Sequence, residues 1–541
     1  MSAFIFAGFV PVYFFLVFRR NQTFISLLVQ DKIFILFLSF FAGIYTVNVF
    51  LIITSLLSIN FSFQSVWIFS VVFFVLFIAI ILFEVFRRKD LEATVSPEKP
   101  DNLNFSRDAG GFKSSGNHDY ADYNCTGSGK KNIPGMIQFF LLKNTKAGNI
   151  IFIIFYALIF FNFLIVVFFT FLFPVRFWDA ISCWSLKAKA FFIDGSIFPF
   201  YTGHNYIFSH LSYPLYLPLS QTWIYIWIGE ADQTLVKIIF PVFYAGLIYT
   251  AYYLLSKKLK KLSAVILAFI LSATPIIIDH GYIEYTNLLF GTALLIGVWF
   301  LYLFLQEESN LYLKIIKKKR VFYGFEVYGT ALTASLFFCI AAQVRSEGMI
   351  FLALFIAVLL GTRIRYLFDK IISKTGLVFS FALPSVACIV FLVPWLYLKK
   401  KLGLSFISTE WQSLLPGLTG SSGQQEMAGG QAVNLYFDFM ESFKNISAEI
   451  AYSFSDSTRA FLGSSYGILW ISLLTLFALK IKKIFRQFNW VFAVFFYSGL
   501  IMVFLSLGLV GEFAWSVDRY LLHIFPLAYF WVLSGLKNQP V

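Results

Sequence analysis

The fold is decided by residues 150–173, IIFIIFYALIFFNFLIVVFFTFLF, a run of 24 residues without a single charge. A helix needs about 20 predominantly apolar residues to cross the hydrocarbon core of a bilayer. We therefore predict a transmembrane helix over residues 150–173.

Twelve further apolar runs have the same character. They lie at residues 2–18, 33–59, 65–86, 235–256, 262–278, 288–305, 329–344, 348–362, 376–398, 465–479, 489–510 and 520–536. The sequence therefore predicts an all-α, polytopic transmembrane helical bundle of about 13 spans. We expect juxtamembrane helices in its outer loops.

The composition supports this class and excludes others. Of 541 residues, 59% are hydrophobic and only 13% are charged, whereas soluble proteins have about 45–50% apolar and about 25% charged residues. Soluble enzyme folds, nucleic-acid modules and disulfide scaffolds are thereby excluded. The net charge of +14 does not indicate a nucleic-acid partner, because the basic residues cluster beside apolar runs, as in membrane topology. None of the four cysteines forms a CxxC motif, so no zinc site is expected.

Basic clusters orient the predicted bundle, because cytoplasmic loops are enriched in Lys and Arg. We place on the cytoplasmic side Arg19 and Arg20, residues 87–89, 257–261 and 317–320, Arg363 and Arg365, and Lys480, Lys482 and Lys483. The outer loops are then residues 174–234, 279–287, 345–347, 399–464 and 511–519. Alternation holds if residues 213–229 form a re-entrant or membrane-surface helix, and a lone crossing helix is the competing interpretation. Lys399, Lys400 and Lys401 are an exception, because they fall outside.

Five regions follow from this topology. Residues 1–86 form N-terminal transmembrane helices, and residues 87–149 form a cytoplasmic insertion whose Gly, Ser, Asn and Asp content predicts disorder. Residues 150–398 form the transmembrane core with the candidate outer loops. Residues 399–464 form a large outer loop whose glycine-rich part, 417–430, suits either a lid or a plain linker. Residues 465–541 form the C-terminal transmembrane helices.

Ionisable residues in the outer loops are the candidates for chemistry, because such groups at membrane depth are costly and often functional. Asp179 follows the first core span, and a carboxylate there could act as a general base. Lys187 and Lys189 could bind a phosphate. An aromatic belt with snorkelling lysines is an equally good interpretation of this segment.

Two further clusters lie in the next outer segments. His204, His210 and Tyr213 could place a sugar or phosphate or serve an interfacial structural role, and the spacing of the two histidines argues against a metal. Asp279 and Glu284 lie in a short turn, where they could jointly bind a divalent cation or the acceptor. A merely polar turn is the alternative, and a metal requirement stays open.

The last two clusters combine arginine with an acid. Arg345 and Glu347 interrupt two apolar runs and form either a structural ion pair or a substrate contact. Asp518 and Arg519 precede the final apolar run, and the guanidinium of Arg519 suits bidentate phosphate binding. The rival interpretation pairs Arg519 with Asp518 or with lipid headgroups.

The order of these motifs resembles a known family. WDAxxxWxxKAK at 178–189, YPLYLPL at 213–219, the acidic turn, RxEG at 345–348 and DRYLLHxxP at 518–526 together resemble the GT-C superfamily of polytopic glycosyltransferases. The branch around protein O-mannosyltransferases and lipid A aminoarabinose transferases is most similar. The likeness runs from about residue 150 to residue 536 and leaves out the first three predicted spans and the 87–149 insertion. The sequence reads Asp-Ala where several members have Asp-Glu, and Tyr-Pro-Leu in place of a double proline.

The resemblance implies an inverting sugar transferase in the cell membrane with its active site facing outside. Its partners are a polyprenyl-phosphate sugar donor, a glycan, lipid or protein acceptor, and membrane lipids. Asp179 matches the catalytic acid of the first outer loop, and Asp279 or Glu284 matches a second acidic position. Phosphate-binding candidates are Lys187, Lys189, His210 and Arg519. Substrate-binding candidates are His204, Tyr213, Arg345, Glu347 and Asp518. A lipid-linked glycan flippase or polymerase, or a solute transporter, is the alternative function.

Overall fold

The computed structural model describes residues 2–17, 24–94, 146–202, 209–316, 326–368, 374–404, 465–466, 469–484, 490–510 and 518–534. These residues form helices and turns, and no strand occurs among them. The predicted all-α class is therefore confirmed for this part of the chain. The lid proposed at 417–430, most of the 87–149 insertion and His204 lie outside the described residues.

Each of the 13 predicted apolar runs contains a helix. They are α1 (Ser2–Val17), α2 (Phe24–Leu56), α3 (Phe63–Thr94), α5 (Lys146–Leu172), α9 (Ile239–Lys258), α10 (Lys261–Ser272), α12 (Asn287–Ile316), α13 (Glu326–Val344), α14 (Gly348–Phe368), α15 (Lys374–Lys401), α18 (Leu469–Ile484), α19 (Trp490–Val510) and α21 (Phe525–Ser534). Six segments, in α2, α3, α5, α9, α12 and α15, are long and apolar enough to cross a membrane over their described residues. The total of about 13 spans stays a prediction.

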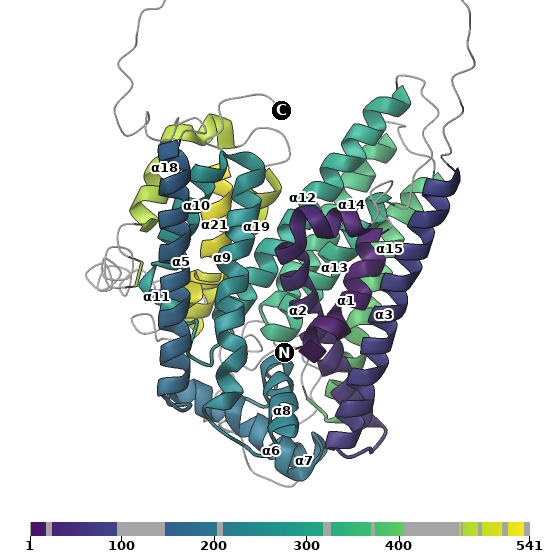
Figure 1. The fold of residues 1–541 in the computed structure, drawn as a ribbon, viewed down its shortest axis with the longest axis vertical. Helices are drawn as coiled ribbons and strands as arrows, with labels where there is room; N and C mark the ends of the chain where they lie inside the picture. Colours follow the sequence, from purple (N-terminus) through teal and green to yellow (C-terminus); the bar gives the residue numbers. More distant parts are fainter. Residues whose placement is uncertain are drawn as a thin grey trace, which may run out of the picture.

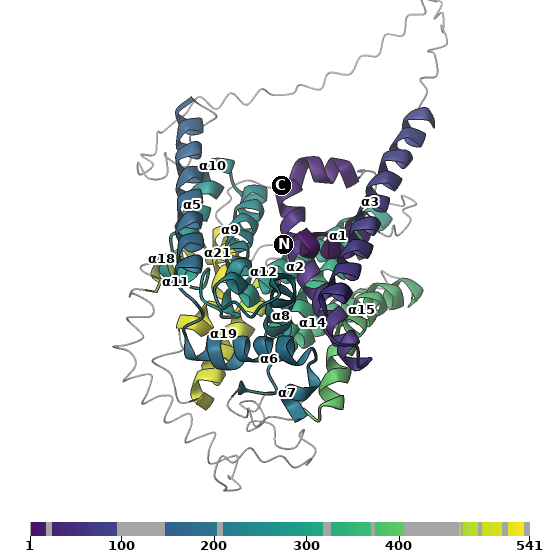
Figure 2. The same cartoon turned by 60° about the horizontal axis from the view of Figure 1, so that its bottom comes forward.

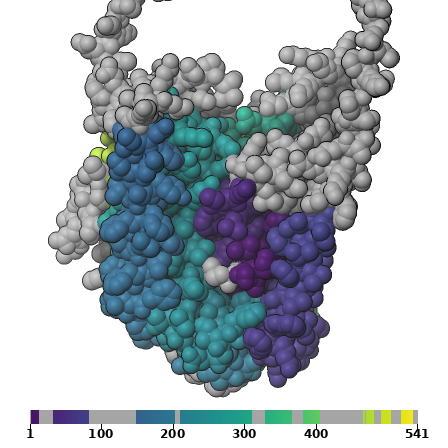
Figure 3. Space-filling model, in the orientation of Figure 1, coloured from purple at the N-terminus to yellow at the C-terminus, as the bar shows by residue number. Residues whose placement is uncertain are grey.

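Two of these helices, α3 and α5, lie at opposite edges of the bundle (Figures 1 and 3). Their apolar side chains point outward: Val75 is 57% exposed and Phe161 is 59% exposed. A helix that is apolar on all sides and exposed cannot be stable in water, but it is stable in contact with lipid chains. The chain is therefore a membrane protein.

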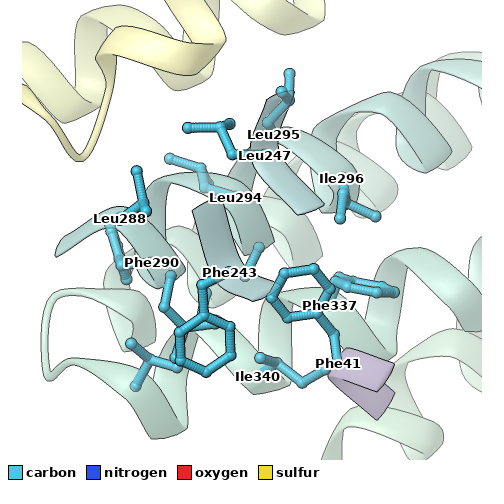
Figure 4. Packing of buried hydrophobic residues seen from close by; sticks show 14 of the residues in the cluster. Phe41, Phe243, Leu247, Leu288, Phe290, Leu294, Leu295, Ile296, Phe337 and Ile340 are labelled. Atoms are coloured by element: carbon cyan, nitrogen blue, oxygen red, sulfur yellow. The ribbon is translucent and has the colours of Figure 1, made fainter. Parts of the chain in front are cut away.

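The centre of the bundle is α12, which packs against α13 and α9. Figure 4 shows how rings from three helices meet beside it. The ring of Phe41 stacks on that of Phe243 with 5.8 Å between their centroids, and Phe337 meets Phe41 edge-on. Aromatic rings thus fill the space between these helices. Small residues in their place would let the helices approach more closely.

Helices α1 and α2 approach each other much more closely. A Cβ atom on Gly43 would lie 1.5 Å from the carbonyl oxygen of Phe4, and one on Gly8 would lie 1.7 Å from that of Ser39. Only glycine permits this contact, which is the usual basis of close helix packing in membranes.

The structure corrects two predicted boundaries. The run at 262–278 is not one helix, because α10 ends at Ser272 and a separate short helix, α11 (Pro275–Asp279), follows. Proline cannot donate a backbone hydrogen bond and keeps the residue before it extended, and Thr274 has ψ of 122°. The insertion predicted at 87–149 is also shorter, since α3 continues to Thr94 and α5 begins at Lys146.

One end of the bundle is closed by short helices between α5 and α9. They are η1 (Ala180–Ser185), α6 (Leu186–Asp194), α7 (Phe198–Thr202), α8 (Tyr216–Ile228) and η3 (Leu235–Ile238). Figure 1 shows α6 and α7 lying across this end, and Figure 2 brings it forward. These are juxtamembrane helices of the kind expected in an outer loop.

Helix α8 does not cross the bundle. It begins inside it, where the hydroxyl of Tyr216 donates to the carbonyl oxygen of Phe41 in α2 at 3.0 Å. It ends near the point where the amide of Val175, just after α5, donates to the carbonyl oxygen of Gln233. Its 13 residues span only about 20 Å, less than the roughly 30 Å core of a bilayer. The placement of residues 213–229 as a re-entrant or membrane-surface helix stays a prediction.

Candidate functional site

Residues from several predicted outer loops lie close together at the end of the bundle where α6 lies. The closest link joins Asp179, at the start of η1, to Arg519, which precedes α21. Nη1 of Arg519 donates to Oδ2 of Asp179 at 2.7 Å, across 340 residues of sequence. The two side chains are 28% and 44% exposed. The pair is therefore accessible from outside the protein core.

A second ion pair lies beside the first. Nη2 of Arg345 donates to Oε1 of Glu347 at 2.9 Å. Asn287, the first residue of α12, accepts from Nη1 of Arg345 at 3.3 Å and donates to the carbonyl oxygen of Arg519 at 2.9 Å. One amide side chain thus fixes the spacing of both arginines.

Aromatic rings form the walls around the two arginines. The guanidinium carbon of Arg519 lies 5.2 Å from the ring centre of Tyr285. That of Arg345 lies 5.5 Å from the ring centre of Tyr520. Both distances fall within the range of favourable cation–π contacts. These rings therefore help to hold the two guanidinium groups in place.

Asp518 has a different position from the one predicted. Its Oδ1 accepts from the backbone amide of Arg519 at 2.7 Å, and its Oδ2 accepts from the hydroxyl of Ser465 at 2.8 Å. The hydroxyl of Tyr466 donates to its carbonyl oxygen. These contacts tie the chain before α21 to residues 465–466, and the carboxylate that receives Arg519 is that of Asp179.

Lys187 is completely buried in α6. Its Nζ donates to the carbonyl oxygen of His210 at 2.8 Å and lies 5.9 Å from the ring centre of Tyr213. Burial lowers the pKa of Lys187 to about 7, and the charge of Lys399 acts in the same direction. A nearby anion would therefore favour the protonated, ammonium form of Lys187.

His210 is held in an unusual backbone conformation. Its φ is 49°, a region that residues with a Cβ rarely adopt. Its ring stacks on that of Tyr213 at 4.7 Å. Strain of this kind persists only where surrounding contacts enforce it, and it often marks binding sites.

Lys189 lies on the opposite face of α6 from Lys187 and is exposed. Residues two apart on a helix do not share a face, so the structure brings only one of the two predicted lysines into the site. Lys399 is 3% exposed, which explains why this lysine departs from the charge pattern of the loops. It is turned into the protein and does not serve as a topological anchor.

Asp279 and Glu284 do not meet each other. The hydroxyl of Tyr282 donates to Oδ1 of Asp279 at 2.8 Å. Oε1 of Glu284 instead lies 3.5 Å from Nζ of Lys237, with both side chains almost fully buried. Burial raises the pKa of Glu284 to about 7, although Lys237 opposes the shift.

Four residues of this region were not among the predicted site residues: Asn287, Tyr285, His280 and His523. All four lie within three residues of a selected acid or in the motif that contains Arg519. Their neutral side chains carry no signal of their own in a sequence, which is why charge alone did not select them.

The described residues contain no group of three or more His, Cys, Asp or Glu side chains arranged to hold a metal ion. No family model matches the chain, and no curated protein or solved structure is significantly similar to it.

Proposed function

We propose that this protein is a membrane glycosyltransferase of the GT-C type that uses a polyprenyl-phosphate sugar as donor. The observation that supports the proposal is the ion pair between Asp179 and Arg519. It places a carboxylate and a guanidinium side by side at one end of a membrane bundle. Sugar transfer from a lipid phosphate needs both groups, a base for the acceptor and a cation for the departing phosphate.

The proposed reaction is a single inverting displacement. The acceptor hydroxyl oxygen forms a bond to the anomeric carbon of the sugar while the bond from that carbon to the phosphate oxygen breaks. The bonding electrons leave with the phosphate, and the hydroxyl proton passes to the carboxylate of Asp179. The products are the glycosylated acceptor and the polyprenyl phosphate.

Arg519 holds the phosphate in this proposal. A guanidinium has five N–H donors, so it can contact Asp179 and a phosphate oxygen at the same time. The same hydrogen bond orients Asp179, because the carboxylate oxygen that accepts from Arg519 stays directed toward the guanidinium. Lys187 and His210 lie on the α6 side and supply further contacts to the anion.

The remaining predicted residues receive supporting roles. Asp279 is the better candidate for the second acidic position, because Glu284 is 1% exposed and paired with Lys237. Arg345, Glu347 and Tyr213 form the wall that contacts the sugar or acceptor. Lys189 remains a surface contact to lipid headgroups.

We propose that the α6 end of the bundle faces the outside of the cell membrane. The opposite end carries Lys257 and Lys258, the two basic residues at the end of α9. Cytoplasmic loops carry such clusters. An outer active site also suits a donor that is activated by its sugar–phosphate bond and needs no nucleotide.

The test uses the full chain purified and reconstituted into sealed lipid vesicles. It is incubated with polyprenyl-phosphate mannose, glucose and aminoarabinose, together with a membrane acceptor extract, and donor cleavage is followed. Cleavage of one donor that is lost in Asp179→Asn supports the proposal. Donor movement across the bilayer without cleavage supports the flippase or transporter alternative and overturns it.

A further inference from the structure

Two histidines lie buried beside the two arginines of the site. His280 follows α11 and His523 lies in the turn before α21, and each is 4% exposed. The ring of His280 is 5.7 Å from that of Tyr285, and the ring of His523 is 4.8 Å from that of Phe290. The charge of Arg519 acts on both imidazoles. Both histidines therefore lie close to Arg519 and its ion pair with Asp179.

The hydrogen bond of His280 defines its tautomer. Its Nδ1 lies 2.9 Å from the carbonyl oxygen of Ile276. A carbonyl only accepts, so Nδ1 carries the proton and Nε2 presents a lone pair. Burial lowers the pKa of His280 to about 4, so the ring is neutral at physiological pH. His280 thus offers a hydrogen-bond acceptor.

Nε2 of His280 and Nε2 of His523 are both buried and have no hydrogen-bond partner among the described residues. Buried polar atoms in folded proteins are almost always paired with protein or water, because leaving them unpaired is costly. His523 also borders a cavity of about 10 Å³ together with Glu347 and Tyr520. Such a cavity has room for about one water molecule or one hydroxyl group.

The groups around the two histidines restrict which group can pair with their Nε2 atoms. An anionic oxygen cannot donate to the lone pair of Nε2, and an ammonium group is repelled by Arg345 and Arg519. A hydroxyl can donate to one imidazole nitrogen and accept from another. A molecule that carries both an anion for Arg519 and neutral hydroxyls beside it satisfies every group in this region.

We propose that His280 and His523 form a hydroxyl-binding subsite that recognises the sugar of the lipid-phosphate donor. The subsite rests on the proposed function, since the phosphate is assigned to the neighbouring Arg519. The histidines contact sugar hydroxyls and take no part in proton transfer. They determine whether the enzyme distinguishes a sugar-bearing lipid from the bare lipid phosphate.

The test compares two lipids and measures their affinity for the full chain in nanodiscs. One lipid is polyprenyl phosphate, and the other is whichever of polyprenyl-phosphate mannose and polyprenyl-phosphate glucose binds more tightly. In His280→Asn, the side-chain amide can still donate to Ile276 in place of Nδ1, but nothing occupies the position of Nε2. We expect the sugar-bearing lipid to bind about tenfold more weakly and polyprenyl phosphate to bind as in the wild type.

Two further variants complete the comparison. His523→Phe keeps a ring against Phe290 and removes both nitrogens, and it is expected to lose the same preference for sugar. Tyr244→Phe is the control, because it deletes a buried neutral hydrogen bond, to Ser272, and leaves the nitrogens of both histidines in place. It is expected to keep the preference.

The outcomes separate the subsite from the proposed function. If both histidine variants keep the wild-type preference, the nitrogens bind only an ordered water and the subsite is overturned. Equal weakening of both lipids, or a loss of preference in Tyr244→Phe as well, also overturns it. If the wild type itself does not distinguish the two lipids, the subsite is overturned, whereas the proposed function is decided separately by whether a donor is cleaved.

Discussion

Arg519 donates to Asp179 at 2.7 Å although the two residues are 340 positions apart in the chain. The contact joins the loop after the first core helix to the segment before the last helix. It also means that the proposed base and the proposed phosphate ligand are not independent, because one guanidinium serves both. Substitutions at the two positions are therefore expected to interact.

The first prediction concerns Asp179. In Asp179→Asn the amide oxygen still accepts from Arg519, but the side chain cannot take a proton. Removal of a general base typically slows a reaction by about 10²–10⁴-fold, so transfer should fall by this amount while donor affinity stays near the wild-type value. Initial rates and donor binding are measured on the same preparation. Activity within a few-fold of the wild type would exclude Asp179 as the base.

The second prediction concerns Arg519. A charge-assisted hydrogen bond contributes roughly 1.5–3 kcal/mol, so Arg519→Ala should weaken donor binding by about 10- to 150-fold. Arg519→Lys keeps the charge without the planar geometry and should fall between. Arg363→Lys is the matched control, because Arg363 forms a buried pair with Glu308 at a distance from the site. Asp518→Ala should change the stability of the segment more than it changes donor affinity.

The third prediction concerns pH. The pKa of Lys187 is about 7, so this ammonium loses its proton as the pH rises through that value. Affinity for an anionic donor should therefore decrease above about pH 7, and Lys187→Met should bind weakly with no such decrease. Glu284, whose pKa is also about 7, provides the control: Glu284→Gln should keep the pH dependence of the wild type. A decrease that survives in Lys187→Met would assign it to another group.

The fourth prediction concerns the sidedness of the insertion. Cys125 belongs to the region predicted to be cytoplasmic, whereas Cys183, Cys339 and Cys388 are buried. A membrane-impermeant thiol reagent should therefore label Cys125 in permeabilised cells and leave intact cells unlabelled. Cys125→Ser is the control for background labelling. Labelling of Cys125 in intact cells would reverse the orientation of the bundle.

The fifth prediction concerns the contact between α1 and α2. A Cβ on Gly43 would collide with the backbone of Phe4, so Gly43→Ala should destabilise the protein by about 1–3 kcal/mol. Gly361 is a matched control in another helix, because a Cβ there meets nothing within 4 Å. Gly361→Ala should leave thermal stability unchanged or raise it slightly. Equal melting temperatures of the two variants would contradict the close packing of α1 and α2.

The helices were predictable because their signal is local. Residues 150–173 are apolar at every turn, and such a run can only be satisfied by a helix in lipid. The two predicted boundaries that were wrong have equally local causes that were overlooked. Pro275 ends the helix at Ser272, and the residues after Phe86 retain helical propensity beyond the apolar run.

The partners of the charged residues were decided only by the tertiary structure. The sequence predicted that Asp179, Arg519, Arg345 and Glu347 lie in outer loops, because the basic clusters between the apolar runs set the alternation of the spans. It could not show that Arg519 meets Asp179 in place of its neighbour Asp518, or that Glu284 pairs with Lys237. Those contacts depend on how helices far apart in the chain pack against one another, and the free energy of a buried charge depends on the partner that this packing brings within hydrogen-bond distance.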